Sequence, residues 1–233
     1  MTALLPHERE KARRVGAMFD GIAPRYDVMN RLMSAGQDQR WRRLAVAALS
    51  PLPPGPLLDI GAGTGDLALA LRRRHPRRTV VGVDLSGGML SVAHAKSAEL
   101  RLARADTLRL PLADRVFAAA ATAFTLRNVA DLGAALHEIR RTLQPGAPFA
   151  CLEITRPESG PLARLFALYF HGIVPRVGAL VSGRAGAYRY LPESVDRFVT
   201  GRGLASAITA AGFREVQFRR FWPGPVTLHT ARA

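Results

Sequence analysis

A glycine-rich turn between an apolar strand and a helix constrains this chain most. Residues 57–66 read Leu-Leu-Asp-Ile-Gly-Ala-Gly-Thr-Gly-Asp, and a second apolar run, 80–84, ends in Asp84. Glycine lacks a Cβ, so such a turn brings backbone close to a ligand, and a helix beginning near Thr64 would direct its N–H groups there. A carboxylate such as Asp84, at the end of the second strand, is suited to binding ribose hydroxyls. Together the two segments predict a nucleoside site.

The acidic character of the turn indicates which nucleoside is bound. The third glycine is Gly65, so the dinucleotide pattern GxGxxG is not met, and Asp59 and Asp66 would place negative charge beside a pyrophosphate. S-adenosylmethionine carries a ribose, an ammonium and a sulfonium but no phosphate, and acidic neighbours suit it. The alternative is a glycine-rich turn in some other α/β protein, because short motifs also arise by chance.

Length and composition predict one domain, residues 1–233, with a helical N-terminal extension at 1–50 and an insertion at 157–200. The single cysteine, Cys151, has no internal partner for a disulfide, and the six histidines show no metal-ligand spacing. Residues 1–14 lack the apolar run of a signal peptide. We therefore expect a cytoplasmic protein without a metal; a homo-oligomer is left open.

The net charge of +15 favours an acidic partner, either nucleic acid or an anionic membrane face. Only Lys11 and Lys96 among the 33 basic residues are lysine, which indicates compositional bias more than a binding site. We interpret the arginine-rich runs 40–43, 72–74 and 77–78 as solvated surface charge. Aromatic residues make up only 7% of the chain, so no nucleic-acid partner is expected.

The apolar periodicity predicts an α/β fold in which a mostly parallel sheet carries helices on both faces. In the first fifty residues it predicts two amphipathic helices, separated by an irregular piece at 24–27 and followed by a proline-rich linker at 51–56. Strands are predicted at 57–60, 79–84, 100–105, 116–122, 148–155, 213–221 and 226–231, and helices at 65–74, 87–97, 131–143 and 202–211. The alternation stops after Pro157, where an insertion is expected over the ligand-binding edge of the sheet.

Several blocks in order resemble the quinone-ring C-methyltransferases of menaquinone and ubiquinone biosynthesis, which are class I S-adenosylmethionine-dependent enzymes with a Rossmann-like fold. Besides the glycine turn, the matching blocks lie at 19–27, 82–86, 126–129, 152–153 and 187–194. Leu-Arg-Asn-Val at 126–129 and Tyr-Arg-Tyr-Leu-Pro-Glu-Ser at 188–194 are the specific ones. One departure is Ala123-Phe124-Thr125, where many relatives have Ser-Phe-Gly, so a serine contact found in some of them is missing.

The resemblance implies S-adenosylmethionine as the cofactor, with Asp84 on the ribose and Asp106 and Thr107 beside the adenine amino group. The full set of expected cofactor-binding residues is Asp59, Gly61, Gly63, Thr64, Gly65, Asp84, Leu85, Asp106 and Thr107. No metal is expected. The N-terminal helices are expected to form a lid over this site.

The reaction implied is C-methylation of a polyprenylated quinol ring, most directly demethylmenaquinol to menaquinol. A quinol ring carbon becomes a better nucleophile once a neighbouring phenol ionises, and a phenol with a pKa near ~10 needs a base or a positive neighbour at pH 7. Candidate bases are Asp27, Tyr190 and His229, and Arg25 and Arg127 are candidates for stabilising the phenolate.

Each candidate also has a structural alternative. Arg25, Tyr26 and Asp27 would equally form an ion-pair cluster that closes the lid, and Arg127 with Asn128 would fix the loop after the fourth strand. A histidine such as His229, on a terminal strand, is more often packed in a core.

A polyprenyl tail implies contact with a membrane surface. The insertion supplies apolar residues for a tail groove or an interfacial face: Leu162, Leu165, Phe166, Leu168, Tyr169, Phe170, Ile173, Val174 and Val177. We expect association with the inner face of the cell membrane. Methylation of a polyprenyl benzoquinol, methylation of RNA and a nonenzymatic cofactor-binding subunit are the alternatives.

Overall fold

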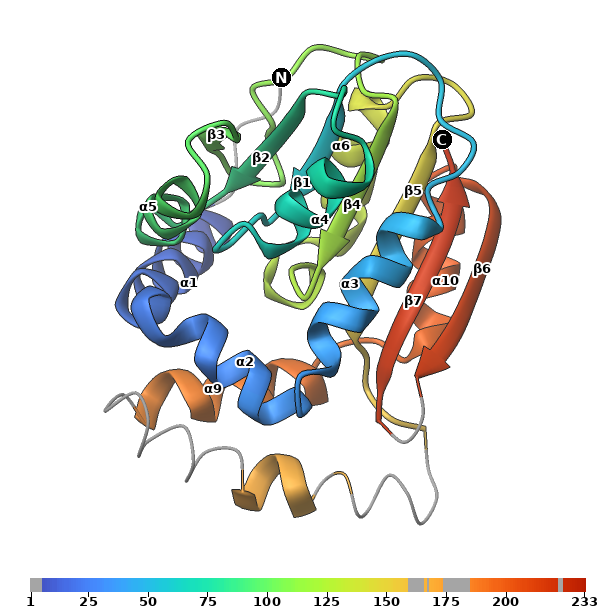
Figure 1. Cartoon of the computed structure of the whole chain (residues 1–233). Helices are drawn as coiled ribbons and strands as arrows, with labels where there is room; N and C mark the ends of the chain where they lie inside the picture. The colour runs from blue at the N-terminus through green and yellow to red at the C-terminus, as the bar shows by residue number, and fades with distance from the viewer. Residues whose placement is uncertain (1–5, 159–165, 167, 174–184, 222–223) are drawn as a thin grey trace.

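In the computed structural model, a seven-stranded sheet with the order β3-β2-β1-β4-β5-β7-β6 organises the chain (Figure 1). The structure describes residues 6–158, 166, 168–173, 185–221 and 224–233. The strands are β1 (Leu57–Ile60), β2 (Val80–Asp84), β3 (Arg101–Arg104), β4 (Ala119–Ala123), β5 (Pro148–Ile154), β6 (Arg214–Phe221) and β7 (Val226–Arg232). The first five are parallel, whereas β7 runs antiparallel to both β5 and β6. This arrangement confirms the mostly parallel sheet.

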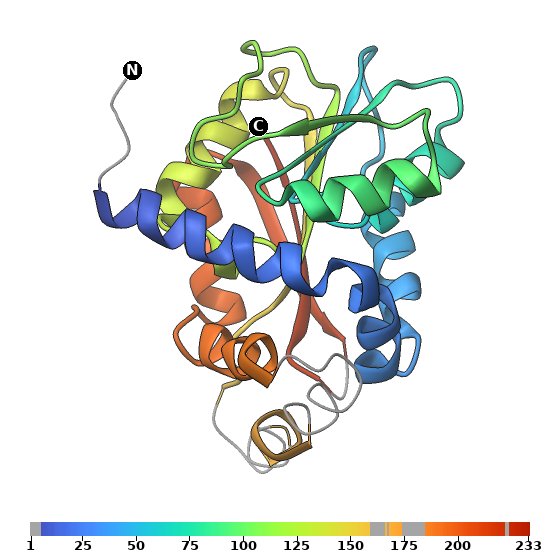
Figure 2. The ribbon, with the colours of Figure 1, turned by 90° about the vertical axis from the view of Figure 1, so that its left-hand side faces the viewer.

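Helices cover both faces of the sheet, each over its own apolar cluster. One cluster joins the strands to α6 (Leu132–Thr142) and α10 (Gly201–Ala210), through residues such as Leu136 and Leu204. The other joins them to α3 (Gln37–Ala47) and α4 (Asp66–Arg74). Figure 2 shows the two layers on opposite sides of the strands. The fifth core helix, α5 (Gly87–Lys96), packs on β2 and β3.

The predicted core elements are confirmed, with differences of a few residues at their ends. The capping of α6 is as expected, since the Asp131 carboxylate accepts a hydrogen bond from the Ala134 N–H at 2.9 Å. One boundary moves in the glycine turn: α4 begins at Asp66, not near Thr64, because Gly65 adopts the left-handed conformation with a φ of 85°. The strand predicted at 116–122 begins at Ala119, since Phe117 forms only an isolated bridge with Leu143.

The prediction of two N-terminal helices is wrong, because the extension folds into three. These are α1 (Pro6–Ile22), α2 (Tyr26–Ser34) and α3, with a 3-10 turn, η1 (Ala23–Arg25), in place of the irregular piece. Pro24 stands at the start of that turn, where a missing N–H costs no hydrogen bond, so the helical path continues into α2. The break between α2 and α3 comes at Ala35 and Gly36, whose φ values are 49° and 75°.

Two helical segments described within the predicted insertion lie near the N-terminal helices. A short π-helix, η3, spans Tyr169–Ile173, and α9 spans Ala185–Asp196. The Tyr169 hydroxyl donates a hydrogen bond to the Met33 carbonyl at 3.0 Å, which ties η3 to α2. Leu162, Leu165, Val174 and Val177 lie outside the described residues. Among the helices that the structure describes, none has the length and apolar character needed to cross a membrane.

Candidate functional site

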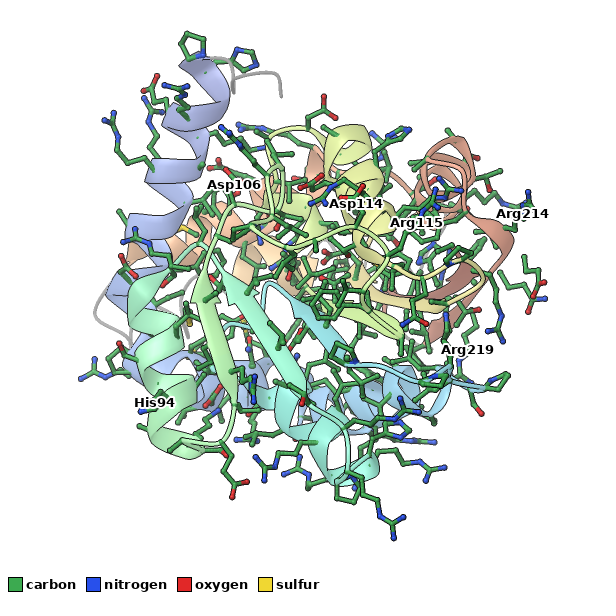
Figure 3. All side chains as sticks on the ribbon, turned by 90° about the horizontal axis from the view of Figure 1, so that it is seen from above. His94, Asp106, Asp114, Arg115, Arg214 and Arg219 are labelled. Carbon is green, nitrogen blue, oxygen red and sulfur yellow. The ribbon has the colours of Figure 1, made fainter. Side chains whose placement is uncertain are left out.

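A small cavity of about 80 Å³ lies at the carboxyl ends of β1, β2 and β4. This edge is where the strand order reverses, between β1 and β4, and is the expected ligand position in an open α/β sheet. Its lining includes Asn128 and six of the predicted cofactor residues: Gly61, Gly63, Asp84, Leu85, Asp106 and Thr107. Figure 3 labels Asp106 in the loop that follows β3. We call this space the cofactor cavity.

Asp84 is fixed at the end of β2 by two backbone donors. Its Oδ2 accepts from the Gly63 N–H and its Oδ1 from the Ser86 N–H, both at 2.8 Å. Burial raises the pKa of this carboxyl, and the two backbone donors oppose that rise. A carboxylate has about four lone-pair sites, so Asp84 retains acceptor capacity for the two hydroxyls of a ribose.

The glycines of the turn are required by its shape. Gly61, Gly63 and Gly65 have φ values of 67°, 53° and 85°, all in the left-handed region. A Cβ on Gly61 would also overlap the side chain of Thr125, in the loop after β4. The turn therefore packs directly against that loop, which brings two backbone segments together at the cavity wall.

Three further predicted cofactor residues, Asp59, Thr64 and Gly65, are buried and do not line the cavity. Thr64 is buried, and its hydroxyl donates to Asp27 at 2.5 Å. Asp59 on β1 is fully buried, and neither carboxylate oxygen has a hydrogen-bonding partner among the described residues. Burial raises the pKa of Asp59 to about 7, against the opposing positive charge of Arg42. Asp59 therefore affects the electrostatic potential of the site more than it contributes to the wall of the cavity.

Arg42 corrects the interpretation of the run 40–43 as solvated charge. Its side chain is only 7% exposed, packs its guanidinium 5.3 Å from the centre of the Phe124 ring, and faces Asp38 at 3.8 Å. The helical spacing of α3 turns Arg42 inward, while Arg40 and Arg43 remain exposed. The arginine behind Phe124 places a positive charge close to the acidic glycine turn.

The N-terminal helices form the predicted lid, and polar contacts hold it closed. Figure 2 shows α1 lying between α5 and α9. Asp20 of α1 accepts hydrogen bonds from the Ser86 hydroxyl and the Gly88 N–H, at 2.6 and 2.8 Å. The Lys11 ammonium donates to the Val129 carbonyl at 2.6 Å. At about 80 Å³ the cavity under these helices is smaller than the 300–1,000 Å³ typical of ligand pockets.

Asp27 belongs to the lid contacts, not to a cavity wall. The Lys96 ammonium bridges Asp27 and Asp66 at 2.5 and 2.7 Å, and the Thr64 hydroxyl donates to the other Asp27 oxygen. This geometry corresponds to the structural alternative for the 25–27 cluster. Arg25 is exposed on η1 and lines neither cavity, whereas Tyr26 lines both.

A second cavity, about 1050 Å³ and mainly apolar, opens beside the first. It is lined from α1, α2, α3, η3 and α9, and we call it the acceptor cavity. Among its apolar lining residues are Met18, Met29, Met33, Trp41, Tyr169 and Phe170. Phe19, Tyr26 and Phe124 line both cavities and mark where the two spaces meet.

Arg127 reaches the acceptor cavity from the 3-10 turn η2 (Leu126–Asn128), which follows β4. Its Nη1 lies 2.7 Å from Oε1 of Glu153, a fully buried residue on β5, and also donates to the Phe124 carbonyl at 2.5 Å. Oε2 of Glu153 accepts from the Arg127 backbone N–H at 3.3 Å. The guanidinium is therefore held in one orientation by a carboxylate that has no access to solvent.

The other expected catalytic residues differ in their position. Tyr190 of α9 lines the acceptor cavity, and burial raises the pKa of its phenol, although Arg127 opposes the rise. Asn128 lines the cofactor cavity, and its Oδ1 is buried with no partner among the described residues. His229, by contrast, is buried on β7, with Nε2 bonded to the Gly201 carbonyl at 2.9 Å and its ring stacked on Phe218. It lines neither cavity, so the structure gives it no route to a substrate.

Four residues of the site had no role assigned from sequence: Asp20, Arg42, Phe124 and Glu153. Asp20 and Glu153 stand inside blocks that carry the family resemblance, which was a usable indication. Arg42 had none, because its burial follows only from how α3 packs.

The comparisons with known proteins agree with this geometry. The model of the ubiE/COQ5 methyltransferase family matches residues 7–233. A demethylmenaquinone methyltransferase of Thermus thermophilus is 44% identical over 216 residues, covering 91% of this chain and 98% of the relative. The ubiquinone/menaquinone biosynthesis C-methyltransferase UbiE of Syntrophotalea carbinolica is 43% identical over 217 residues, covering 91% of each.

The fold is shared with solved methyltransferase structures. An S-adenosylmethionine-dependent methyltransferase from Thermotoga maritima, described as a possible histamine N-methyltransferase, superposes with a TM-score of 0.64 at 20% identity. That match covers 93% of this chain and 98% of the other. The Rossmann-like class I fold is thus confirmed, and so is the resemblance read from the sequence blocks: the chain belongs to the ubiE/COQ5 methyltransferase family.

Proposed function

We propose that this methyltransferase transfers the methyl group of S-adenosylmethionine to a ring carbon of a polyprenylated demethylmenaquinol. The observation that carries the proposal is the pair of adjoining cavities, a small one that contains the carboxylates of Asp84 and Asp106 and a large, mainly apolar one, which share Phe19, Tyr26 and Phe124. The name of the Thermus thermophilus relative, demethylmenaquinone methyltransferase, supports a naphthoquinol as the substrate.

The residues of the cofactor cavity fit a cationic nucleoside. Asp84, Asp106 and Thr107 line this cavity, where Asp84 would accept hydrogen bonds from the ribose and Asp106 with Thr107 would lie beside the adenine. The unpartnered Asn128 Oδ1 offers an acceptor to an ammonium group. The carboxylates disfavour a diphosphate at the same place. When bound, S-adenosylmethionine supplies a methyl group already activated by its sulfonium.

In the acceptor cavity, Arg127 would stabilise the phenolate form of the quinol. A phenol of pKa near ~10 is mostly neutral at pH 7, and a cation within a few ångströms lowers that pKa. Glu153 offsets part of the Arg127 charge, and at 2.7 Å it also fixes where the guanidinium points. Tyr190, kept protonated by burial, would donate a hydrogen bond to the same oxygen.

Methyl transfer requires the ring carbon, the methyl carbon and sulfur in line and shielded from water. The junction of the two cavities at Phe19, Tyr26 and Phe124 meets this requirement with apolar and aromatic walls. The new C–C bond would form as the C–S bond breaks, which leaves S-adenosylhomocysteine. The methylated ring carbon would then release its proton to water, which restores the aromatic ring of the quinol.

The tail of the substrate would occupy the remaining acceptor cavity and extend to a membrane. We propose that the protein works at the inner face of the cell membrane as a peripheral protein. Its net charge of +15 supports attraction to anionic lipid. Methylation of a polyprenyl benzoquinol is the second candidate, favoured by the name of the Syntrophotalea carbinolica relative.

A methyl-transfer assay tests the substrate. Purified protein would receive radiolabelled S-adenosylmethionine and, in parallel reactions, a short-tailed demethylmenaquinol, a demethylated benzoquinol or RNA. We expect label in the naphthoquinol product. Label only in benzoquinol or RNA would replace the proposal with that alternative, and binding of the cofactor without transfer would favour a nonenzymatic subunit.

A further inference from the structure

The outward face of α2 carries exposed apolar side chains that nothing in the described structure covers. Val28 and Leu32 are 54% and 55% exposed, among only five large hydrophobic residues that stand out as exposed in the described part of the chain. A third, Leu168, is 70% exposed and lies at the wall of the acceptor cavity. Clustered exposed apolar residues mark an interaction surface, whereas single ones do not.

The segment that bears Leu168 is tied to α2 beside the acceptor cavity, because the Tyr169 hydroxyl donates a hydrogen bond to the Met33 carbonyl at 3.0 Å. The two faces of α2 also have different surroundings: Met29 and Met33 line the acceptor cavity from within, while Val28 and Leu32 face solvent. Exposed apolar side chains are thus present both on α2 and, at Leu168, on the wall of the acceptor cavity.

The charged residues nearest to this face are two arginines. Arg25, Val28 and Leu32 recur along the outward side at spacings of three and four, and Arg25 is exposed. Arg31 lies beside them, with its side chain 47% exposed and its guanidinium 3.4 Å from the Asp66 carboxylate. The single acid of α2, Asp27, is turned inward to Lys96 and Thr64. An apolar row flanked by arginines is the pattern of a helix that lies in the headgroup region of an anionic bilayer.

We propose that the exposed row of Arg25, Val28 and Leu32, which runs from η1 along α2, docks the protein on an anionic lipid bilayer with the acceptor cavity opening toward the membrane. The inference rests on the proposed function, because a membrane-held quinol tail would enter the acceptor cavity directly from this side. Val28 and Leu32 insert among the acyl chains, and Arg25 contacts a lipid phosphate.

The test is sedimentation with vesicles that contain phosphatidylcholine and roughly a third phosphatidylglycerol, since anionic lipid supplies the attraction. The double variant Val28→Asp/Leu32→Asp should lower the bound fraction about tenfold or more, because each buried aliphatic side chain contributes enough for such a change. Raised salt should weaken binding of the unaltered protein, and pure phosphatidylcholine should bind it poorly. Val28→Gln/Leu32→Gln removes the apolar groups without adding negative charge and should lose binding as well.

A matched control is Val116→Asp. Val116 is 39% exposed and precedes β4, at the amino-terminal edge of the sheet and away from both cavities. This variant should bind vesicles as the unaltered protein does, and thermal unfolding verifies that all variants are folded. Equal binding by Val28→Asp/Leu32→Asp and by Val116→Asp would overturn the proposal, and so would no binding of the unaltered protein.

Failure of the docking surface is distinguishable from failure of the proposed function. Val28 and Leu32 line neither cavity, so the double variant should keep its activity on a short-tailed quinol in solution. It should lose activity on a long-tailed quinol embedded in the vesicles. Loss on both substrates by a folded variant would contradict a docking role.

Discussion

The two cavities of this protein differ in how their walls are built. The cofactor cavity has a floor of short loops at the ends of β1, β2 and β4 and is covered by α1, and its polar contacts come mostly from backbone or from residues next to a strand end. The acceptor cavity is assembled from helices far apart in sequence, as α2 and η3 illustrate. A site on strand ends is fixed by the sheet, whereas a site between helices depends on the contacts that hold those helices together.

We therefore expect the largest effect of a single substitution at a strand end in the cofactor cavity. Replacing Asp84 by Asn should weaken S-adenosylmethionine binding at least about 100-fold, because one backbone donor and the ribose hydroxyls compete for fewer acceptor sites. Isothermal titration calorimetry measures this. Asp114→Asn, on an exposed carboxylate paired with Arg141, is the control and should bind normally. If Asp84→Asn kept its affinity for S-adenosylmethionine, Asp84 would not be a residue that binds the cofactor.

The next largest effect is expected from the ion pair of Arg127 and Glu153, beside the acceptor cavity. Arg127→Gln should lower kcat about 10- to 100-fold while leaving cofactor affinity unchanged, since a charged hydrogen bond to the phenolate is lost. The pH at which activity rises should move upward in Arg127→Gln and downward in Glu153→Gln. The second shift has the opposite sign because a buried negative charge 2.7 Å from the guanidinium is removed.

The readout is the pH profile of kcat with a short-tailed quinol, together with thermal unfolding of each variant. Shifts of the same sign in both variants would mean that Arg127 and Glu153 act only as a structural pair.

A third prediction concerns Asp59, under the cofactor cavity. The pKa of Asp59 in the folded protein is about 7, whereas its ordinary value is 3.8, so between pH 3.8 and pH 7 the folded state binds one more proton than the unfolded state. The stability contribution is therefore fully present below about pH 4 and is lost as pH rises through 7. Asp59→Asn should raise the unfolding free energy at pH 8 by about 2 kcal/mol relative to the unaltered protein, and by little at pH 4.

Denaturant unfolding at the two pH values measures this difference. If the difference in unfolding free energy between the two proteins is the same at pH 4 and pH 8, Asp59 is ionised at both pH values, because Arg42 stabilises its charge.

The smallest effect is expected in the lid. Lys96→Met removes the ammonium group that lies 2.5 Å from the Asp27 carboxylate and 2.7 Å from the Asp66 carboxylate. Because such partly exposed ion pairs contribute little, stability should fall by only about 1 kcal/mol. Hydrogen exchange of the α2 amides should nevertheless become faster, while that of β4 stays unchanged. Unaltered exchange in α2 would mean that apolar packing alone closes the lid.

The sequence was informative where chemistry is local. The alternation of strands and helices, the glycine turn, the Asp84 position and the Asp131 cap all follow from residues near one another in the chain. The third N-terminal helix was missed, because the break at Ala35-Gly36 depends on two successive left-handed residues, one of them not glycine. The burial of Arg42 and the isolation of His229 depend on packing between distant segments, which periodicity does not encode.

The three aromatic residues shared by the two cavities couple their occupants. Phe19 and Tyr26 belong to the N-terminal helices, so any displacement of these helices that makes room for the nucleoside also reshapes the wall against which the quinol packs. Thermodynamic linkage makes this reciprocal: whatever factor one occupant adds to the affinity of the other is returned in full. Phe124 completes the coupling from the sheet side, with a φ of 63° that holds its ring between the two compartments. A ligand that moves these aromatic rings in one cavity therefore also changes the shape of the other.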